Sequence, residues 1–441
     1  MSLKGDTKGF LKAGHLPTLI TAFLYFDVCF SVWIVNGAMA PFISEEFHLS
    51  PSQKGFMVSV PVIAGALMRF PLGILAQYIG RKRAAMLEMS IICCCLVWGY
   101  YFTNSLGSLF AMGIALGVAG ASFGVALSLG SGWYPPKYKG LAMGIAGAGN
   151  SGTVIAMLAA PPLALAYGWR TVYLLGLMPM GVAMVLLQLL AKEPPDRDPK
   201  TKMKDYLKIL VSRDAWIFNL MYSVTFGGFI GLASFLPTLF HDQYGVPKQS
   251  VGLYVTVGVV AASVLRVAGG WLADKIGGLR LLYVLGGIIL CGIAAAASMP
   301  TSPVVMAVAV ALAMGAMGAG NGAVFQLVPL RFAAATAVAG SLIGEIGALA
   351  GGFLPNAMGL GKQHYGSFTP GFVGGALLTV AALIALAMVS RKWTSTWVGE
   401  GGKARDHGPE HDHGDHGGHG SHGSHASHAT SATHAAREVA P

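Results

Sequence analysis

Charged side chains are scarce in this sequence. Asp, Glu, Lys and Arg together make up 11% of the 441 residues, whereas soluble proteins carry roughly 25%. Hydrophobic residues make up 54%, and the mean hydropathy is +0.61. The shortage of charge excludes a soluble enzyme, a nucleic-acid-binding module and a fibrous protein. Because about 20 apolar residues cross a bilayer once, the composition predicts a polytopic membrane protein.

Cysteine is also rare, and the motifs that carry enzyme chemistry are missing. The five cysteines all fall inside apolar stretches, where a thiol packs as a small hydrophobic side chain. The sequence contains no phosphate-binding loop, no nucleophile–base arrangement and no cluster of metal ligands within its apolar runs. We therefore expect neither an enzyme nor a cofactor or metal site. The first apolar run lacks a small-residue cleavage site, so it predicts an uncleaved targeting helix.

Twelve apolar runs are long enough to span a bilayer, and a charged loop divides them six and six. We predict a six-helix half at 1–191, a linker at 192–213, a second half at 214–391 and a disordered tail at 392–441. The tail holds nine of the 13 histidines and is either solvated without a defined role or a weak scavenger of divalent metal. The predicted spans are 17–43, 56–80, 84–103, 106–133, 139–167, 170–191, 214–240, 249–276, 279–299, 302–330, 334–360 and 367–391.

Lysine and arginine lie mostly on one side of these spans. Twenty-three of the 29 fall in the terminal segments and the even-numbered loops, four in the odd-numbered loops and two within spans. Cytoplasmic loops of membrane proteins are enriched in basic residues. The bias therefore predicts a protein of the cytoplasmic (inner) membrane with both termini in the cytoplasm.

An internal repeat relates the two halves. RFPLGILAQYIGRKR at 69–83 recurs as RVAGGWLADKIGGLR at 266–280, and GASFG at 120–124 recurs as GAGNG at 318–322. Duplicated halves are typical of carriers whose substrate site lies at the bilayer midplane. The repeated loop resembles the loop signature of the major facilitator superfamily, which implies an all-α membrane fold of 12 transmembrane helices in two pseudo-symmetric halves. We expect the two copies of this loop to form a conformational latch, in which Gln77 weakens the first copy. The latch residues are Gly73, Arg83, Gly270, Asp274 and Arg280.

Two arginines lie inside the predicted spans at matching depth. Arg69 precedes the end of its span at Gly80 by 11 residues, which is roughly 16 Å, or about half of the hydrocarbon core. Arg266 has the same depth by the repeat. An arginine at the bilayer centre costs at least about 2.5–3.5 kcal/mol. We therefore expect the pair to bind an anion, the alternative being structural ion pairs with Asp27 and Glu345.

Glycine and aromatic residues near the arginines suggest the size and shape of the anion. Glycine-rich runs in the fifth, tenth and eleventh spans favour close helix packing and a small cavity. A guanidinium is a planar fork that suits a flat anion, and rings could cover such an anion. The candidate aromatic residues are Tyr25, Phe26, Phe123, Tyr222 and Phe226, although rings on one helix face are more often packing residues. Asn150 and Asn321 interrupt the glycine runs and offer amide donors.

Together these residues resemble the nitrate/nitrite porter family of the major facilitator superfamily. GIAGAGNSGTV at 144–154 resembles the nitrate signature of that family, and FLYFDVCFSVW at 23–33 and GAGNGAVFQLVP at 318–329 extend the likeness. The resemblance implies that Arg69 and Arg266 bind the anion. It also implies that Phe123, Tyr222 and Phe226 sandwich the anion, and that the signature helix with Asn150 lines the pathway. The eleventh span, GSLIGEIGALAGG, keeps the glycines of that family but also carries Glu345.

The resemblance and the charges lead to a functional expectation. Moving a monovalent anion into a negative-inside cell costs about 2.3 kcal/mol per 100 mV, so uptake needs a proton or a counter-anion. We expect uptake of nitrate, with nitrite as a further substrate, by alternating access with proton symport, as in nitrate assimilation. Asp27 and Glu345 are the candidate proton carriers. The expected protein is a monomer in the lipid bilayer without a nucleic-acid partner.

Three alternatives remain open at this point. The first is nitrate/nitrite antiport. The second is a carrier of another small monovalent anion such as formate, which would also use paired arginines. The third is a non-transporting receptor or metal-handling protein that acts through the His-rich tail.

Overall fold

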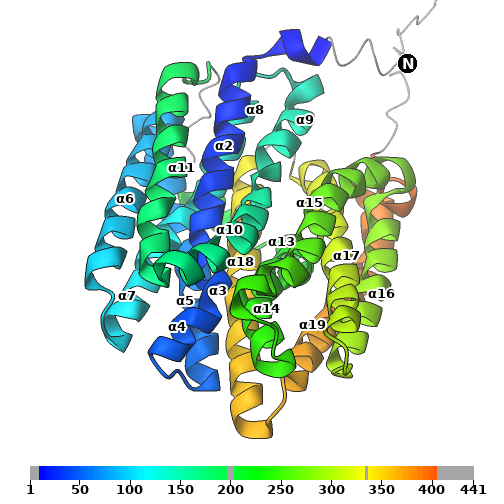
Figure 1. Ribbon diagram of the computed structural model, residues 1–441. Coiled ribbons are helices and arrows are strands. Elements are labelled where there is room, and N and C mark those ends of the chain that lie inside the picture. The colour runs from blue at the N-terminus through cyan, green and yellow to red at the C-terminus, as the bar shows by residue number, and fades with distance from the viewer. Residues whose placement is uncertain (1–8, 196–202, 333–335, 405–441) are drawn as a thin grey trace, which may run out of the picture. The chain divides into compact units, whose positions relative to one another are not determined.

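The structure is a computed structural model, and it describes residues 9–195, 203–332 and 336–404 (Figure 1). Regular secondary structure in this part of the chain is helical, and 12 helices within it are long and apolar enough to cross a membrane, which confirms the predicted number. The His-rich run from His407 lies outside the described residues. The spans are Leu16–Trp33, Pro51–Ile79, Arg81–Phe102, Leu106–Ser131, Leu141–Tyr167, Trp169–Leu190, Arg213–Tyr244, Lys248–Ile276, Gly278–Ala297, Pro303–Arg331, Val338–Tyr365 and Thr369–Thr396.

The two helices that carry the membrane arginines end in the same way. Helix α5 (Pro51–Ile79) contains Arg69, and helix α15 (Val251–Ile276) contains Arg266. Each helix ends at a glycine with positive φ, Gly80 at 94° and Gly277 at 97°. Residues with a side chain rarely adopt this conformation, so the repeated glycines turn the chain sharply into helices α6 (Arg81–Phe102) and α16 (Gly278–Ala297).

The first predicted span is not one continuous helix. The structure divides 17–43 into α2 (Leu16–Trp33), α3 (Val35–Ala38) and α4 (Ala40–Glu46), with breaks at Ile34 and Met39. Pro41 lies in the first turn of α4, where a missing N–H is tolerated. The hydrophobic pattern alone gives no sign of these breaks, because the residues on both sides of them are apolar.

Three spans depart from regular α-helix near the depth of the arginines. A 3-10 turn at Val118–Ala121 joins α7 (Leu106–Gly117) to α8 (Ser122–Ser131). Another, at Ala148–Ser151, joins α9 (Pro136–Gly147) to α10 (Gly152–Tyr167). A π-turn at Ser223–Gly227 joins α13 (Arg213–Tyr222) to α14 (Gly228–Tyr244). Irregular backbone at membrane depth frees carbonyl groups and is tolerated where it is buried in protein or lines a cavity.

The two halves meet tightly at the end of the bundle that carries the odd-numbered loops, hereafter the odd-loop end, which is the lower end in Figure 1. Here α5 packs along α18 (Thr336–Tyr365), and α10 packs on α15. A Cβ on Gly55 would lie 2.5 Å from the carbonyl oxygen of Pro355, and one on Gly252 would lie 1.7 Å from that of Met157. Only glycine allows such close contact, so the helices of the two halves touch through their backbones.

Ion pairs join the halves at the same end. Lys54 Nζ lies 2.6 Å from Asp242 Oδ2, and Lys248 pairs with Glu45. The backbone N–H of Ser52 donates to the side-chain oxygen of Gln363 at 3.1 Å. The odd-loop end is therefore closed by charge as well as by packing.

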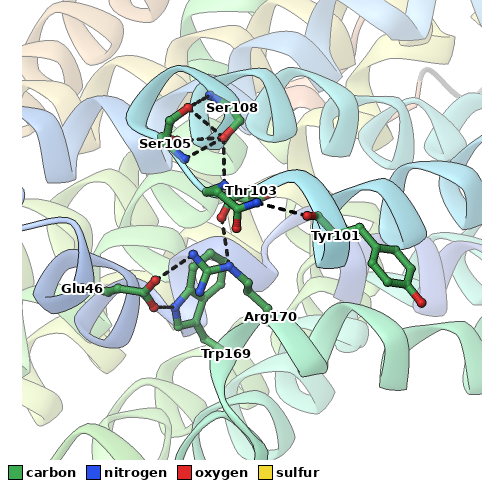
Figure 2. A network of polar contacts seen from close by, with 8 residues as sticks. Glu46, Tyr101, Thr103, Ser105, Ser108, Trp169 and Arg170 are labelled. Carbon is green, nitrogen blue, oxygen red and sulfur yellow. Dashed lines mark hydrogen bonds and ion pairs between the residues drawn. The ribbon is translucent and has the colours of Figure 1, made fainter.

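A network of polar contacts holds the end of α4 in place near the closed odd-loop end (Figure 2). Trp169, the first residue of α11 (Trp169–Leu190), donates its Nε1–H to Glu46 Oε2 at 2.5 Å, and Arg170 pairs with Glu46 at 2.7 Å. Arg170 Nε also donates to the carbonyl of Thr103 at 2.9 Å. Burial by itself would raise the pKa of the Glu46 carboxyl, but the hydrogen bonds from Arg170 and Trp169 outweigh it, so the pKa is lowered.

At the opposite, even-loop end, the repeated loop is held by partners that the sequence did not suggest. Glu193 accepts hydrogen bonds from the backbone N–H groups of Arg81 and Lys82 at 2.7 and 2.9 Å, which caps the start of α6. In the second half, Arg280 pairs with Glu400. Each half thus has a carboxylate, placed after its sixth span, that engages the start of its third span.

The predicted latch residues are only partly brought into contact. Arg280 is paired, and a Cβ on Gly270 would lie 3.9 Å from Gly322, within van der Waals contact. Gly73 has no neighbouring atom within 4 Å of the same position, and Arg83 and Asp274 are exposed. Among the described residues, neither Arg83 nor Asp274 has an ion pair. In this structure Arg81, Lys82 and Glu193 make the contacts of the loop in the first half, and the latch stays a prediction.

The structure adds a helix to the predicted linker and moves the start of the predicted tail. The linker at 192–213 contains a short helix, α12 (Met203–Leu210). The tail predicted from 392 starts too early, because α19 continues to Thr396 and both Val398 and Gly402 are buried. Gln326 Nε2 lies 3.5 Å from the carbonyl of Gly402, and Gly401 lies against the Arg280 side chain. These contacts keep the segment after the last span on the protein surface.

Candidate functional site

Arg69 is buried between the two halves, with 5% of its surface exposed. Its Nε–H donates to the carbonyl of Gly120 at 3.0 Å, and Nη1 donates to the carbonyl of Gly344 at 2.7 Å. Gly120 belongs to the 3-10 turn of the fourth span, and Gly344 belongs to α18 in the other half. Nη2 is buried and has no hydrogen-bond partner among the described residues. Two nitrogens of the guanidinium, Nε and Nη1, are thus held by hydrogen bonds, while Nη2 still has N–H groups to donate.

Arg266 approaches the same place from the other half. Its guanidinium carbon lies 5.8 Å from the centre of the Phe123 ring, and that of Arg69 lies 5.3 Å from the same ring. Arg266 Nη1 is buried and unpartnered within the described part of the chain. A Cβ on Gly147 would lie 4.0 Å from Arg266 Nη2, so the glycine-rich fifth span leaves room beside the fork. The two arginines therefore converge on one ring.

Four aromatic rings surround the arginines. Tyr222 and Phe226 stack with their centres 5.2 Å apart and their planes 8° from parallel. Phe226 stacks with Phe123 at 6.5 Å and lies 5.4 Å from the Arg69 guanidinium. Phe325 meets Tyr222 edge-on at 5.2 Å and Phe123 at 6.4 Å. The rings of the fourth, seventh and tenth spans thus form one cluster, which we call the aromatic cluster.

Phe325 was not among the sequence candidates. Its position four residues after Asn321 places both on one face of α17 (Pro303–Arg331). The repeat aligns Asn321 with Phe123, which gave an available signal for this face. Asn321 is buried, and its Oδ1 has no hydrogen-bond partner among the residues that the structure describes.

Asn150 is buried, and its side-chain amide donates to carbonyl groups of its own 3-10 turn and the residue before it. In the orientation that satisfies its polar atoms, its side-chain nitrogen lies 3.3 and 3.1 Å from the carbonyl oxygens of Gly147 and Ala148. In this orientation the amide donors are engaged by the turn, and a role for Asn150 in anion binding stays a prediction. The 3-10 turn exposes carbonyl groups that compete for those donors.

The two candidate carboxylates have different surroundings. Asp27 accepts a hydrogen bond from Ser151 Oγ at 2.5 Å, so it links the first span to the signature helix. Glu345 directly follows Gly344, whose carbonyl binds Arg69, and its Oε2 is buried without a hydrogen-bond partner in the described residues. Neither carboxylate lies within the 4.0 Å of an ion pair with Arg69 or Arg266. The alternative in which each arginine is neutralised by its own acid is not what the structure shows.

Tyr25 points away from the aromatic cluster. Its hydroxyl donates to Glu88 Oε2 of α6, and both side chains are fully buried. Glu88 is therefore a buried carboxylate that was not among the sequence candidates. Successive residues of the first span diverge, since Phe26 lies 5.5 Å from the Phe123 ring while Asp27 turns to Ser151.

The arrangement suits a small flat anion. Two permanent positive charges lie between the halves, and among the described residues neither has an acidic partner at ion-pair distance. This arrangement is costly unless an anion compensates the charges. Each fork offers an unpartnered N–H, and the rings supply flat apolar walls. No group of three or more metal-ligating side chains that could hold an ion occurs in the described residues.

Comparisons with known sequences agree with this chemistry. The sequence profile of the Major Facilitator Superfamily matches residues 21–355. A nitrite extrusion protein of Bacillus subtilis (strain 168) is 31% identical over 357 residues, covering 80% of this chain and 89% of that protein. A probable nitrate transporter, NarT, of Staphylococcus carnosus (strain TM300) is 31% identical over 371 residues, covering 82% and 93%. A probable nitrate/nitrite antiporter, NarK1, of Thermus thermophilus is 29% identical over 418 residues, covering 86% and 90%.

Solved structures share the fold. A bacterial homologue of the human lysosomal transporter Spinster, in an inward-facing and occupied conformation, superposes with a TM-score of 0.66 at 19% identity, covering 86% of this chain and 97% of that one. The same protein in an inward-facing and unoccupied conformation gives 0.61 at 21% identity, covering 85% and 95%. At these identities the likeness concerns the arrangement of helices alone.

Proposed function

Because this chain belongs to the major facilitator superfamily and, within it, to the nitrate/nitrite porter family, we propose that it carries nitrate, and also nitrite, into the cell by alternating access with proton symport. It is a multi-pass membrane transporter rather than an enzyme. The relatives named above include a nitrite extrusion protein and an antiporter, so direction and coupling are the parts of the proposal that an experiment must decide.

One observation carries the substrate assignment. The guanidinium carbons of Arg69 and Arg266, one from each half, lie 5.3 and 5.8 Å from the centre of the Phe123 ring. Within the described part of the chain, neither arginine has an acidic partner at ion-pair distance. A planar anion can accept hydrogen bonds from both forks while its faces contact the rings. Formate is also flat, monovalent and small, so it is the competing substrate. A sugar or a peptide would not fit among closely packed glycines.

Glu345 supports the proposed proton coupling. Its carboxyl lies one residue from the carbonyl that binds Arg69, and one of its oxygens is buried without a partner among the described residues. An anion that binds the arginines brings a second negative charge close to Glu345, and like charges favour protonation of a carboxylate. We therefore propose that the proton and nitrate bind together and cross together. Asp27 is the weaker candidate because Ser151 already satisfies one of its oxygens.

The closed odd-loop end fits one state of the transport cycle. Arg266 and Glu345 retain partial solvent exposure, whereas Arg69, Tyr222 and Phe226 are buried. Since the odd-loop end is sealed, we propose that the exposed members of the site face the even-loop end. With the basic even-numbered loops in the cytoplasm, this state is open to the inside. Both termini would then also be cytoplasmic.

The proposal is tested in proteoliposomes with labelled nitrate. We expect an inward pH gradient, acidic outside, to drive nitrate accumulation, and Glu345→Gln to abolish that response while nitrate-for-nitrate exchange continues. Asp27→Asn is the matched control, which should keep the response to pH. Uptake that needs internal nitrite and ignores the pH gradient would replace symport by antiport. Equal competition by formate and nitrate would overturn the substrate assignment.

A further inference from the structure

Trp33, the last residue of α2, lies against the Arg69 guanidinium. Trp33 is fully buried, and its ring centre lies 5.5 Å from the Arg69 guanidinium carbon. We propose that Trp33 is a positioning residue that fixes the orientation of Arg69 for the flat anion. This inference rests on the proposed function.

Trp33 is itself held in one orientation. Its Nε1–H donates to the carbonyl of Pro61 in α5 at 2.7 Å, and Phe30 meets the ring edge-on at 5.2 Å. Two glycines form the slot for the ring. A Cβ would lie 2.5 Å from the ring on Gly65 and 2.3 Å from it on Gly120. The indole is therefore wedged between the second and fourth spans.

The same slot sets the acceptor of Arg69. Gly120, which contacts the Trp33 ring, also accepts the Arg69 Nε–H bond at 3.0 Å. The indole thus acts on Arg69 twice, by contact with the guanidinium and by holding the carbonyl that binds it. An arginine side chain has several rotatable bonds, so without this support the fork samples other directions. A guanidinium over an indole face is also a favourable cation–π contact.

A loosely held fork should affect flat and round anions differently. Nitrate needs the guanidinium plane aligned with its own oxygens, whereas chloride places no demand on that plane. Loss of Trp33 should therefore weaken nitrate binding more than chloride binding. A general packing defect would reduce the amount of folded protein and would not alter the ratio of the two dissociation constants.

The test compares Trp33→Phe and Trp33→Leu with Trp393→Phe in the purified full-length protein. Trp393 is a matched control, since it is also buried, stacked on Phe218 and bonded through Nε1 to a side chain, Asp214 at 2.8 Å. Titrations with nitrate and with chloride give both dissociation constants from curve midpoints, which do not depend on the folded fraction. Thermal midpoints without anion report stability.

We expect the nitrate dissociation constant of Trp33→Phe to rise about tenfold, with a larger rise for Trp33→Leu and little change for chloride, because small misplacements of a binding group cost up to about a hundredfold. Trp393→Phe should lower the thermal midpoint and leave both constants unchanged. An unchanged ratio of nitrate to chloride affinity in both Trp33 variants would overturn the positioning role. A wild-type protein that binds no nitrate would instead overturn the proposed function.

Discussion

The Nη1–H group of Arg69 donates to the carbonyl oxygen of Gly344 across the interface between the two halves, at 2.7 Å. A buried side chain of one half is thus bonded to the backbone of the other, at the depth where the substrate is proposed to bind. If the halves separate at this depth during the transport cycle, this hydrogen bond must break. An anion at the forks would then take over the donor that Gly344 releases.

Replacing either arginine by lysine should nearly abolish nitrate binding. Lysine keeps the charge but loses the planar fork, and hydrogen bonds to charged groups contribute about 1.5–3 kcal/mol each. We expect the nitrate dissociation constant to rise by at least about tenfold in Arg69→Lys and in Arg266→Lys, as measured by titration of the purified protein. Near-normal affinity in either variant would remove that arginine from the site.

Truncating Phe226 should weaken nitrate binding beyond its effect on stability. Phe226→Ala removes a ring that stacks with Tyr222 and lies 5.4 Å from the Arg69 guanidinium. Leu187→Ala, in α11, is the control, because Leu187 is fully buried but is a packing residue. Both variants should lose about 2–5 kcal/mol of stability, and only Phe226→Ala should shift the nitrate titration. Equal shifts would make Phe226 a packing residue.

Reversing one charge of the Lys54–Asp242 pair should weaken the closure of the odd-loop end, and reversing both charges should restore it. Asp242→Lys sets two positive charges together where Lys54 and Asp242 now lie 2.6 Å apart, so the closed end should open more often. A cysteine introduced at Ser59, one turn from Gly55 on the same helix face, should then react faster with a polar thiol reagent that reaches it from the odd-loop end. The double reversal Lys54→Asp with Asp242→Lys should return the labelling rate toward that of the wild type. Identical labelling rates in all three proteins would show that the pair does not govern closure.

Glu46 should make the structure sensitive to acid. Its pKa is lowered, with burial opposed and outweighed by the bonds from Arg170 and Trp169. A carboxyl whose pKa falls on folding adds stability above its unfolded pKa, about 4.3 for Glu, and loses it as the pH falls through the folded value. Wild-type protein should therefore melt at a higher temperature than Glu46→Gln at pH 7, and the difference should shrink as the pH falls below about 4.3. A difference that is constant with pH would contradict this role.

The sequence allows the helices and the arginine pair to be predicted for simple reasons. A bilayer span needs a long apolar run, so the 12 helices are visible in composition alone. The repeat fixes Arg69 and Arg266 at equal depth, because a duplicated segment keeps its position within the span. Membrane arginines are costly, so their presence predicts a ligand.

Other features of the site could not be predicted, because the helices are apolar on every face. Nothing in the local pattern tells that Tyr25 turns to Glu88 while Phe26 turns to Phe123. Phe325 shares a helix face with Asn321, but the spacing alone could not show that this face meets Tyr222 edge-on. The segment around Glu400 was missed because its glycines resemble a flexible tail, although they lie against Arg280.

The π-turn at Ser223–Gly227 means that the number of residues in this turn helps to set where the rings of the seventh span lie. Such a turn holds one residue more than the regular helix. Deleting Val224 would let the helix close normally and rotate the preceding segment by about 100°. Tyr222 would then leave its stack on Phe226, although every ring of the aromatic cluster would still be present in the chain. A one-residue difference in length within this turn would therefore separate the two rings without changing either of them.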